Sequence, residues 1–220
     1  MRILIFGATG MVGQGVLREC LLDPRVTEVV AVVRAASGQA DPKLREVVLA
    51  NMHAFADIAE RFAGFDACFF CLGVSSVGMS EADYTRITYD LTLAIARPLA
   101  TANPAMTFIY VTGAGTHRES RQMWARVKAR TEDALAALPF AAVFLFRPAF
   151  IQPLHGVVSK TRWYMLAYAV TRPLSAALVR HVPHYATTTE RVGRAMIAAV
   201  LEGYPTRVLE STDINALAGD

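Results

Sequence analysis

Short apolar runs alternate with longer amphipathic segments along most of the chain. Runs rich in Val, Ile and Phe predict strands at residues 3–6, 29–33, 47–49, 67–72, 107–111, 142–146 and, with a weaker pattern, 207–209. They lack polar alternation, so we expect both of their faces to be covered. Segments with helical spacing separate them, at residues 11–22, 54–62, 80–101, 119–137 and 188–202. This order predicts parallel βαβ units in a single doubly wound α/β domain.

Two of the predicted helices carry start signals. Ser80 and Thr187 each lie three positions before an acidic residue, Asp83 and Glu190 respectively. A hydroxyl at such a position can cap a free backbone N–H, and the helix dipole favours an acid in the first turn. Pro98, by contrast, is expected to kink or end the first of these helices, because proline has no N–H to donate.

Composition narrows the class of protein. The chain has 220 residues, of which 54% are hydrophobic and 19% charged, and its formal net charge is +3. Disordered chains are rich in charge and poor in aliphatic residues, so a folded protein is predicted. A net charge this small gives no reason to expect a nucleic-acid partner. No apolar run reaches the roughly 18 residues of a membrane-spanning helix, and the stretch after Arg2 is too short for a secretory signal. We therefore expect a cytoplasmic protein.

The cysteine and histidine residues indicate neither a disulfide framework nor a metal site. Cys68 and Cys71 have the C-x-x-C spacing of a redox pair, but they lie in an apolar run of strand type. A redox thiol needs a helix N-terminus to lower its pKa. We interpret both residues, together with Cys20, as part of the core. The histidines are scattered along the chain, so no set of metal ligands is predicted.

A glycine-rich turn follows the first predicted strand directly. It has the pattern G-x-x-G-x-x-G, and the helical pattern of residues 11–22 begins inside it. Glycine here permits a tight turn, lets a pyrophosphate approach the backbone and lets the helix pack close to the strand. The helix N-terminus then offers free N–H groups and positive dipole charge to the phosphates. This context predicts a dinucleotide site formed by Gly7, Thr9, Gly10, Met11, Val12 and Gly13.

Arg34 ends the second predicted strand, and residues 35–38 after it contain no carboxylate. NAD-binding folds usually carry an acid here for the ribose 2′-hydroxyl, whereas an arginine suits the 2′-phosphate of NADP. A charge-assisted arginine–phosphate bond stabilises by about 1.5–3 kcal/mol. NADP(H) is therefore expected to bind about ten- to a hundredfold more tightly than NAD(H). The alternative is a solvated arginine at a strand end.

These residues together resemble the short-chain dehydrogenase/reductase superfamily, in particular its atypical members with the loop Gly-Ala-Thr-Gly-x-x-Gly. The pattern looks like the Tat-interacting-protein type of NAD-dependent epimerase/dehydratase, and residues 209–215 are also similar to that subgroup. The resemblance implies a Rossmann fold that binds a nicotinamide cofactor. It implies that residues 149–187 form a small, irregular C-terminal elaboration that shapes the substrate pocket. It adds cofactor contacts after the fourth and sixth strands, at Leu72, Gly73, Pro148 and Phe150.

The family's catalytic pair is Tyr-x-x-x-Lys on the helix after the fifth strand, where a spacing of four places both side chains on one face. The lysine holds the ribose and lowers the tyrosine pKa, so that the phenol exchanges a proton with the substrate. This chain keeps Lys128 but has Trp124 at the tyrosine position, and an indole N–H does not leave near neutral pH. Thr112, at the end of the fifth strand, can replace the family's serine.

The usual acid of carbonyl reduction is therefore missing from this chain. Side chains that could replace it are Tyr84, Tyr89, His117 and Tyr185, and the sequence does not choose among them. Trp124 has a plainer interpretation as a partly buried aromatic residue.

Two further segments have two interpretations each. Asn51 falls near the family's usual adenine-contacting acid, where an amide could bind adenine or cap the next helix. Residues 160–180 combine aromatic with basic side chains, as an interfacial membrane helix does. The resemblance favours pocket packing instead, and Pro173 interrupts any long helix. The basic residues concerned are Lys160, Arg162, Arg172 and Arg180.

Three functions fit these features. The first is an NADP(H)-binding oxidoreductase or epimerase-like enzyme acting on an unidentified small organic substrate. The second is a nicotinamide-binding regulator or scaffold without turnover, which the missing tyrosine favours. The third is a peripheral membrane protein that uses residues 160–180. Because one fold hosts many activities, the choice depends on the site.

Overall fold

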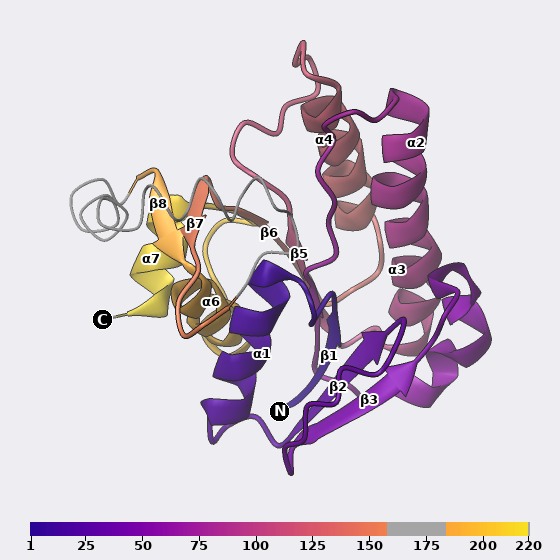
Figure 1. Ribbon diagram of the computed structural model, residues 1–220, viewed down its shortest axis with the longest axis vertical. Coiled ribbons are helices and arrows are strands. Elements are labelled where there is room, and N and C mark those ends of the chain that lie inside the picture. The colour runs from indigo at the N-terminus through magenta and orange to yellow at the C-terminus, as the bar shows by residue number, and fades with distance from the viewer. Residues whose placement is uncertain (158–183, 220) are drawn as a thin grey trace.

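The computed structural model describes residues 1–157 and 184–219. Seven parallel strands in this part of the chain form one sheet, in the order β3-β2-β1-β4-β5-β6-β9 (Figure 1). This order confirms the doubly wound Rossmann-type fold. The strands are β1 (Arg2–Phe6), β2 (Glu28–Val33), β3 (Leu44–Val48), β4 (Ala67–Phe70), β5 (Thr107–Val111), β6 (Ala142–Arg147) and β9 (Val208–Glu210).

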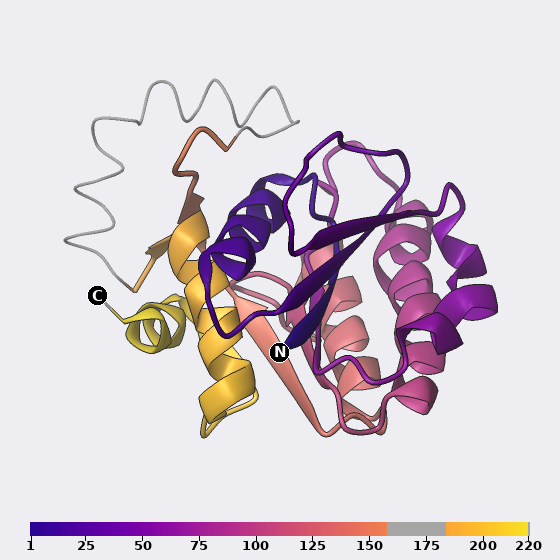
Figure 2. The same cartoon turned by 90° about the horizontal axis from the view of Figure 1, so that it is seen from below.

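Helices cover both faces of the sheet, as Figures 1 and 2 show. One face carries α1 (Met11–Leu22), α6 (Thr189–Glu202) and α7 (Ser211–Ala218). The other carries the 3-10 helix η1 (Met52–Phe62), α2 (Glu81–Thr85), the π-helical turn η2 (Arg86–Asp90), α3 (Leu91–Ala102) and α4 (Met123–Ala136). Because both faces are covered, the strands can be apolar throughout.

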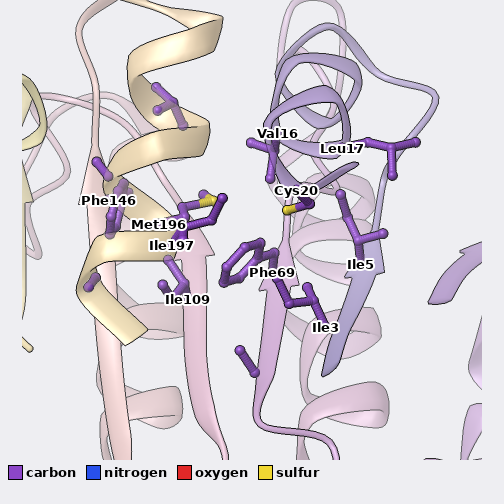
Figure 3. Packing of buried hydrophobic residues seen from close by; sticks show 14 of the residues in the cluster. Ile3, Ile5, Val16, Leu17, Cys20, Phe69, Ile109, Phe146, Met196 and Ile197 are labelled. Carbon is purple, nitrogen blue, oxygen red and sulfur yellow. The ribbon is translucent and has the colours of Figure 1, made fainter. Parts of the chain in front are cut away.

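Alternate residues of each strand belong to two hydrophobic clusters, one on each face. Ile3 and Ile5 pack with α1 and α6, while Leu4 and Phe6 pack with η1 and α3. Figure 3 shows the first cluster, where the labelled side chains of both helices point toward the strands. The register places Ile5 opposite Ala31 in β2 and opposite Phe69 in β4. This core accounts for much of the high apolar content, because strands covered on both faces need apolar residues at every position.

Several predicted elements have different bounds in the structure. β3 begins at Leu44 rather than at residue 47, because a partly exposed edge strand tolerates charged residues that break an apolar run. The helix predicted at residues 80–101 is divided into α2, η2 and α3. Pro98 was predicted to kink or end this helix. It does not end it, since α3 continues to Ala102. Leu99 and Ala100, both buried, hold the last turn against the core.

The C-terminal part contains elements that the sequence patterns did not indicate. β7 (Phe150–Gln152) and β8 (Ala186–Thr188) pair in parallel as a separate two-stranded sheet, so the described parts of segment 149–187 are more regular than expected. Because the chain is still extended at Thr187, the N-cap of α6 is Thr188, one residue later than predicted; its side chain accepts from the N–H of Arg191 at 3.0 Å. Helix α7 was also missed.

The basic and aromatic segment proposed as a membrane contact lies outside the described residues. Lys160, Arg162, Arg172, Pro173 and Arg180 all belong to that part. Within residues 1–157 and 184–219, no helix is long and apolar enough to cross a membrane.

Candidate functional site

The turn between β1 and α1 is closed so tightly that two of its positions require glycine. Gly7 has a φ of +83°, and a Cβ on it would lie 2.6 Å from the carbonyl carbon of Cys71. A Cβ on Gly13 would lie 2.0 Å from the carbonyl oxygen of Gly7. Gly10 occupies the N-cap of α1, and its own N–H donates to Gly7 at 2.9 Å. A turn of this shape leaves room for a ligand's phosphates against the backbone.

The N-terminus of α1 has no side-chain cap among the described residues. Met11 and Val12 form its first turn and pack partly against the core, while the carbonyl of Thr9 accepts from the Gln14 side chain at 3.1 Å. First-turn N–H groups without a cap attract an anion, and the helix dipole strengthens that attraction. All the residues predicted from the glycine pattern therefore meet at one place.

This turn lies where the strand order reverses, between β1 and β4. In open α/β sheets ligands bind at such a point, beyond the carboxyl ends of the strands. Leu72 and Gly73 follow β4 directly, and a Cβ on Gly73 would meet nothing within 4 Å. The backbone beside the turn is therefore open.

Arg34 follows β2 as an exposed side chain. Among the described residues it forms no ion pair within 4.0 Å, and the Glu46 carboxylate on β3 accepts from the N–H of Ser37 at 3.0 Å instead. Of the two interpretations of Asn51, the structure contains the cap: its Oδ1 accepts from the N–H of His53 at 3.1 Å and begins η1. Contact with adenine stays a prediction.

At the other end of the site, Lys128 and Trp124 lie one turn apart on α4. The Nζ of Lys128 donates to the carbonyl oxygen of Thr112 at 2.6 Å, and it would lie 3.8 Å from a Cβ on Gly113. The ring of Trp124 reaches within 3.7 Å of a Cβ placed on Gly115. Burial lowers the pKa of Lys128 to about 8, although the charge of Glu132 acts in the opposite direction. The side chains of Lys128 and Trp124 therefore border the loop after β5, at Gly113 and Gly115 respectively.

Thr112 is buried, and its hydroxyl bonds to that of Thr116 at 3.0 Å. Thr116 donates in turn to the carbonyl oxygen of Gly113 at 2.7 Å. The sequence analysis missed Thr116, although a second threonine four residues after Thr112 was the available signal. The segment after β6 lies beside this loop, because the carbonyl of Pro148 accepts from the N–H of Ala114 at 3.1 Å.

Phe150 opens β7, where its N–H donates to the carbonyl of Tyr185 at 3.0 Å. The structure thus brings Lys128, Thr112, Trp124 and Pro148 together around one loop, with Phe150 two residues further along the chain.

The four side chains considered as replacement acids are not part of this group. Tyr84 is buried and bonded to Thr88, and burial raises its pKa. The guanidinium carbon of Arg130 lies 6.0 Å from the ring centre of Tyr89. His117 is exposed and accepts from a neighbouring N–H at 3.2 Å, and Tyr185 is 67% exposed. None of them has a described hydrogen bond to Thr112, Trp124 or Lys128, so these four side chains show no substitute for the missing tyrosine within residues 1–157 and 184–219.

The cysteines have the environment of core residues. Cys20 and Cys68 are buried, Cys71 is partly buried, and burial raises the pKa of all three thiols, that of Cys71 to about 12. A redox pair requires a shift in the opposite direction. In the part of the chain that the structure describes, no group of His, Cys, Asp and Glu side chains is placed to hold a metal ion.

A family model described as NAD(P)H-binding matches residues 7–145, which is more than half of the chain. The chain belongs to this family. Together with the fold, the match confirms the resemblance to atypical short-chain dehydrogenases/reductases. The matched range contains the glycine turn of residues 7–13, β5 and α4.

Solved structures share the fold at low sequence identity. A short-chain dehydrogenase from Burkholderia cenocepacia, in complex with NADP, is 18% identical with a TM-score of 0.65, over 98% of this chain and 91% of that one. The Bordetella bronchiseptica enzyme WbmF, in complex with NAD+, is 14% identical with a TM-score of 0.66, over 98% of this chain and 76% of that one. Since one neighbour holds NADP and the other NAD+, the fold does not choose between the two cofactors.

Relatives by sequence correct the predicted location. The mitochondrial protein fmp52 of Emericella nidulans is 26% identical over 156 residues, covering 68% of this chain and 66% of that protein. FMP52 of Saccharomyces cerevisiae, also named as mitochondrial, is 27% identical over 67% of this chain and 64% of that protein. The chain thus spans just under two thirds of these relatives. The prediction of a cytoplasmic protein is contradicted, because these relatives are named as mitochondrial proteins.

Proposed function

We propose that this protein binds NADP(H) in preference to NAD(H) and acts as an oxidoreductase on a small organic substrate. The observation that carries the preference is Arg34, an exposed guanidinium without a carboxylate partner among the described residues, at the carboxyl end of β2. In Rossmann folds this position faces the 2′ substituent of the adenosine ribose. An epimerase-like reaction on the same cofactor is the variant of this proposal that the family resemblance allows.

Each part of the cofactor has a matching group in the chain. The uncapped first turn of α1 suits the pyrophosphate, and its glycines leave the space that a Cβ would fill. Lys128 would donate to the ribose beside the nicotinamide, and its bond to Thr112 and the contact of the loop with Pro148 support a place for the ring there. When bound, the reduced cofactor supplies a hydride. The chain supplies orientation and the Lys128 charge.

The test is a comparison of NADPH with NADH at matched concentrations, by calorimetry and thermal unfolding. NADPH at a hundred times its Kd should stabilise the protein by about 2.7 kcal/mol. Arg34→Ala should weaken NADPH binding about ten- to a hundredfold and leave NADH binding unchanged. Arg97→Ala, which removes an exposed arginine on α3, is the matched control. Equal affinities for the two cofactors in the unmodified protein would refute the preference.

A second function is favoured by one observation, the indole of Trp124 where a phenol is expected. On this alternative the protein binds the cofactor and regulates a partner without turnover. It predicts tight NADPH binding together with NADPH oxidation no faster than in protein-free buffer, for quinones and saturated carbonyls alike.

A further inference from the structure

The two hydroxyl groups near Lys128, those of Thr112 and Thr116, already use their protons in hydrogen bonds within the loop. Thr116 donates its single proton to the carbonyl oxygen of Gly113 at 2.7 Å. Its contact of 3.0 Å with Thr112 must therefore use the proton of Thr112. While this pair is intact, neither threonine donates to a substrate, and Thr112 presents only lone pairs.

Two donors remain among the described side chains around the loop. They are the ammonium group of Lys128, with one of its three N–H bonds directed at Thr112, and the indole N–H of Trp124. The Tyr84 hydroxyl is bonded to Thr88, and neither Tyr84 nor Tyr89 has a described hydrogen bond to this loop. An ammonium group and an indole N–H can stabilise negative charge, but the indole does not release its proton. The site is therefore better suited to holding an anionic product than to protonating an alkoxide.

The anion that forms depends on the class of acceptor. Hydride addition to a saturated ketone produces an alkoxide, whose conjugate acid has a pKa near that of water, far above that of a phenol. Hydride addition to a quinone produces a phenolate-type oxygen, whose conjugate acid has a pKa of about 10. The second anion is far less basic, so it needs no acid in the hydride step itself.

The surroundings of Trp124 also favour a flat ring. Its side chain is partly buried at the second position of α4, next to Gly115. The Nζ of Lys128, one turn further along α4, would lie 3.8 Å from a Cβ placed on Gly113 of the same loop. An aromatic face beside an ammonium group suits a planar conjugated ring that carries an oxygen atom.

We propose that the substrate of this site is a quinone, with Trp124 as the surface on which its ring stacks and Lys128 as the charge that holds the developing oxyanion. The inference rests on the proposed cofactor binding. The quinone accepts a hydride, which is two electrons and one proton, from the reduced nicotinamide, which is thereby oxidised. The hydroquinone anion then takes its second proton from water, and a neutral hydroquinone leaves.

The first experiment separates this inference from the proposed function. NADPH binding is measured by calorimetry, and NADPH oxidation is then followed with menadione or cyclohexanone as the acceptor. We expect menadione to be reduced at least a hundredfold faster than cyclohexanone. If NADPH does not bind, the proposed function fails. If NADPH binds and menadione is not reduced faster than in protein-free buffer, or if the two acceptors react equally, the quinone assignment is overturned.

A binding measurement tests the role of Lys128 without turnover. A hydroxynaphthoquinone that is anionic at neutral pH is titrated into the protein saturated with NADP. Because Lys128 loses its proton around pH 8, the anion should bind about tenfold more weakly at about pH 9.5 than at about pH 7. Lys128→Arg should bind the anion at both pH values, since arginine stays charged. An affinity of the unmodified protein that does not change with pH would refute the role of Lys128.

Substitutions of Trp124 test the stacking surface, with NADPH affinity as the check that each variant is folded. Trp124→Phe keeps an aromatic face and should leave the KM for menadione within about threefold, whereas Trp124→Leu should raise it about tenfold. Trp124→Tyr supplies the missing acid and should add cyclohexanone reduction. Equal KM values for the Leu and Phe variants would overturn the stacking role, and a Tyr variant inactive on cyclohexanone would overturn the explanation by a missing acid.

Discussion

At the β1–α1 end of the proposed cofactor site main-chain groups line the turn, whereas at the β5–α4 end side chains line the loop. The turn of Gly7 and Gly13 is shaped by contacts between backbone atoms, and it offers N–H groups that every residue carries. The loop after β5 depends on particular groups, the ammonium of Lys128, the ring of Trp124 and the paired hydroxyl of Thr112. Replacement of one side chain can therefore change the chemistry at one end while the phosphate turn at the other end is preserved.

The largest effect that this comparison predicts follows from Gly13→Ala. The added Cβ would lie 2.0 Å from the carbonyl oxygen of Gly7, so the turn must move. We expect a loss of about 3 kcal/mol in the free energy of unfolding and no measurable NADPH binding. Urea denaturation and calorimetry measure both. Gly73→Ala is the control for stability, because its Cβ would meet nothing within 4 Å. NADPH binding at the original affinity in Gly13→Ala would contradict the steric account.

A smaller loss is expected at the side-chain end from Thr116→Val. The substitution keeps the shape but leaves the buried hydroxyl of Thr112 without its acceptor. The cost should be about 2 kcal/mol, measured by urea denaturation. Thr101→Val removes an exposed hydroxyl on α3 and should change stability by less than about 0.5 kcal/mol. Similar losses of unfolding free energy in both variants would show that the bond between the Thr112 and Thr116 hydroxyls contributes no more to stability than an exposed hydroxyl does.

Lys128→Met should separate stability from binding. In the folded protein the pKa of Lys128 is about 8, against 10.5 for an unperturbed lysine, so the unfolded chain holds more protons between these values. Stability of the unmodified protein should therefore rise as the pH rises through this window, and the burial penalty is fully present below it. The Met variant should be more stable by about 1 kcal/mol at about pH 7, with no advantage above about pH 10.5, while NADPH binds more weakly. Denaturation series at several pH values measure this, and a pH-independent difference would contradict it.

The smallest effect is expected at Asn51, which follows the edge strand β3. Asn51→Ala removes the N-cap of η1 and should lower stability by about 0.5 kcal/mol, the low value for an exposed cap. Asn51→Ser keeps a capping oxygen but loses the amide donor. If the amide also contacts adenine, both variants bind NADPH more weakly, whereas a purely structural cap leaves NADPH affinity unchanged in the Ser variant.

Elements buried on both faces were predicted well, while edge and short elements were not. The run at residues 3–6 and the helix at residues 11–22 agree with β1 and α1 to within a residue, because core packing forces an apolar pattern on both. β3 is an edge strand, so Arg45 and Glu46 interrupt its apolar run and its start was missed. β7 and β8 have three residues each and pair across a long stretch of chain, so no local periodicity marks them.

In the candidate site, the residue types could be predicted from the sequence, but their hydrogen-bond partners could not. The spacing of Trp124 and Lys128 on one helix face follows from helical geometry alone. The hydrogen bond between the hydroxyls of Thr112 and Thr116 depends on how the loop of residues 112–116 turns. The bond of Tyr84 to Thr88 depends on the helical segment that carries both residues.

By itself, the sequence determined the layered α/β architecture, the tight glycine turn after β1 and the replacement of a tyrosine by Trp124 one helical turn before Lys128. These depend on local sterics, on periodicity and on residue identity, none of which requires knowledge of distant neighbours. Only the tertiary structure decided that Arg34 has no carboxylate partner among the described residues. It also decided that burial lowers the pKa of Lys128 to about 8 and that Thr112 and Thr116 use their hydroxyl protons in hydrogen bonds within the loop. Hydrogen bonds, ion pairs and desolvation depend on segments far apart in the sequence, and folding brings those segments together.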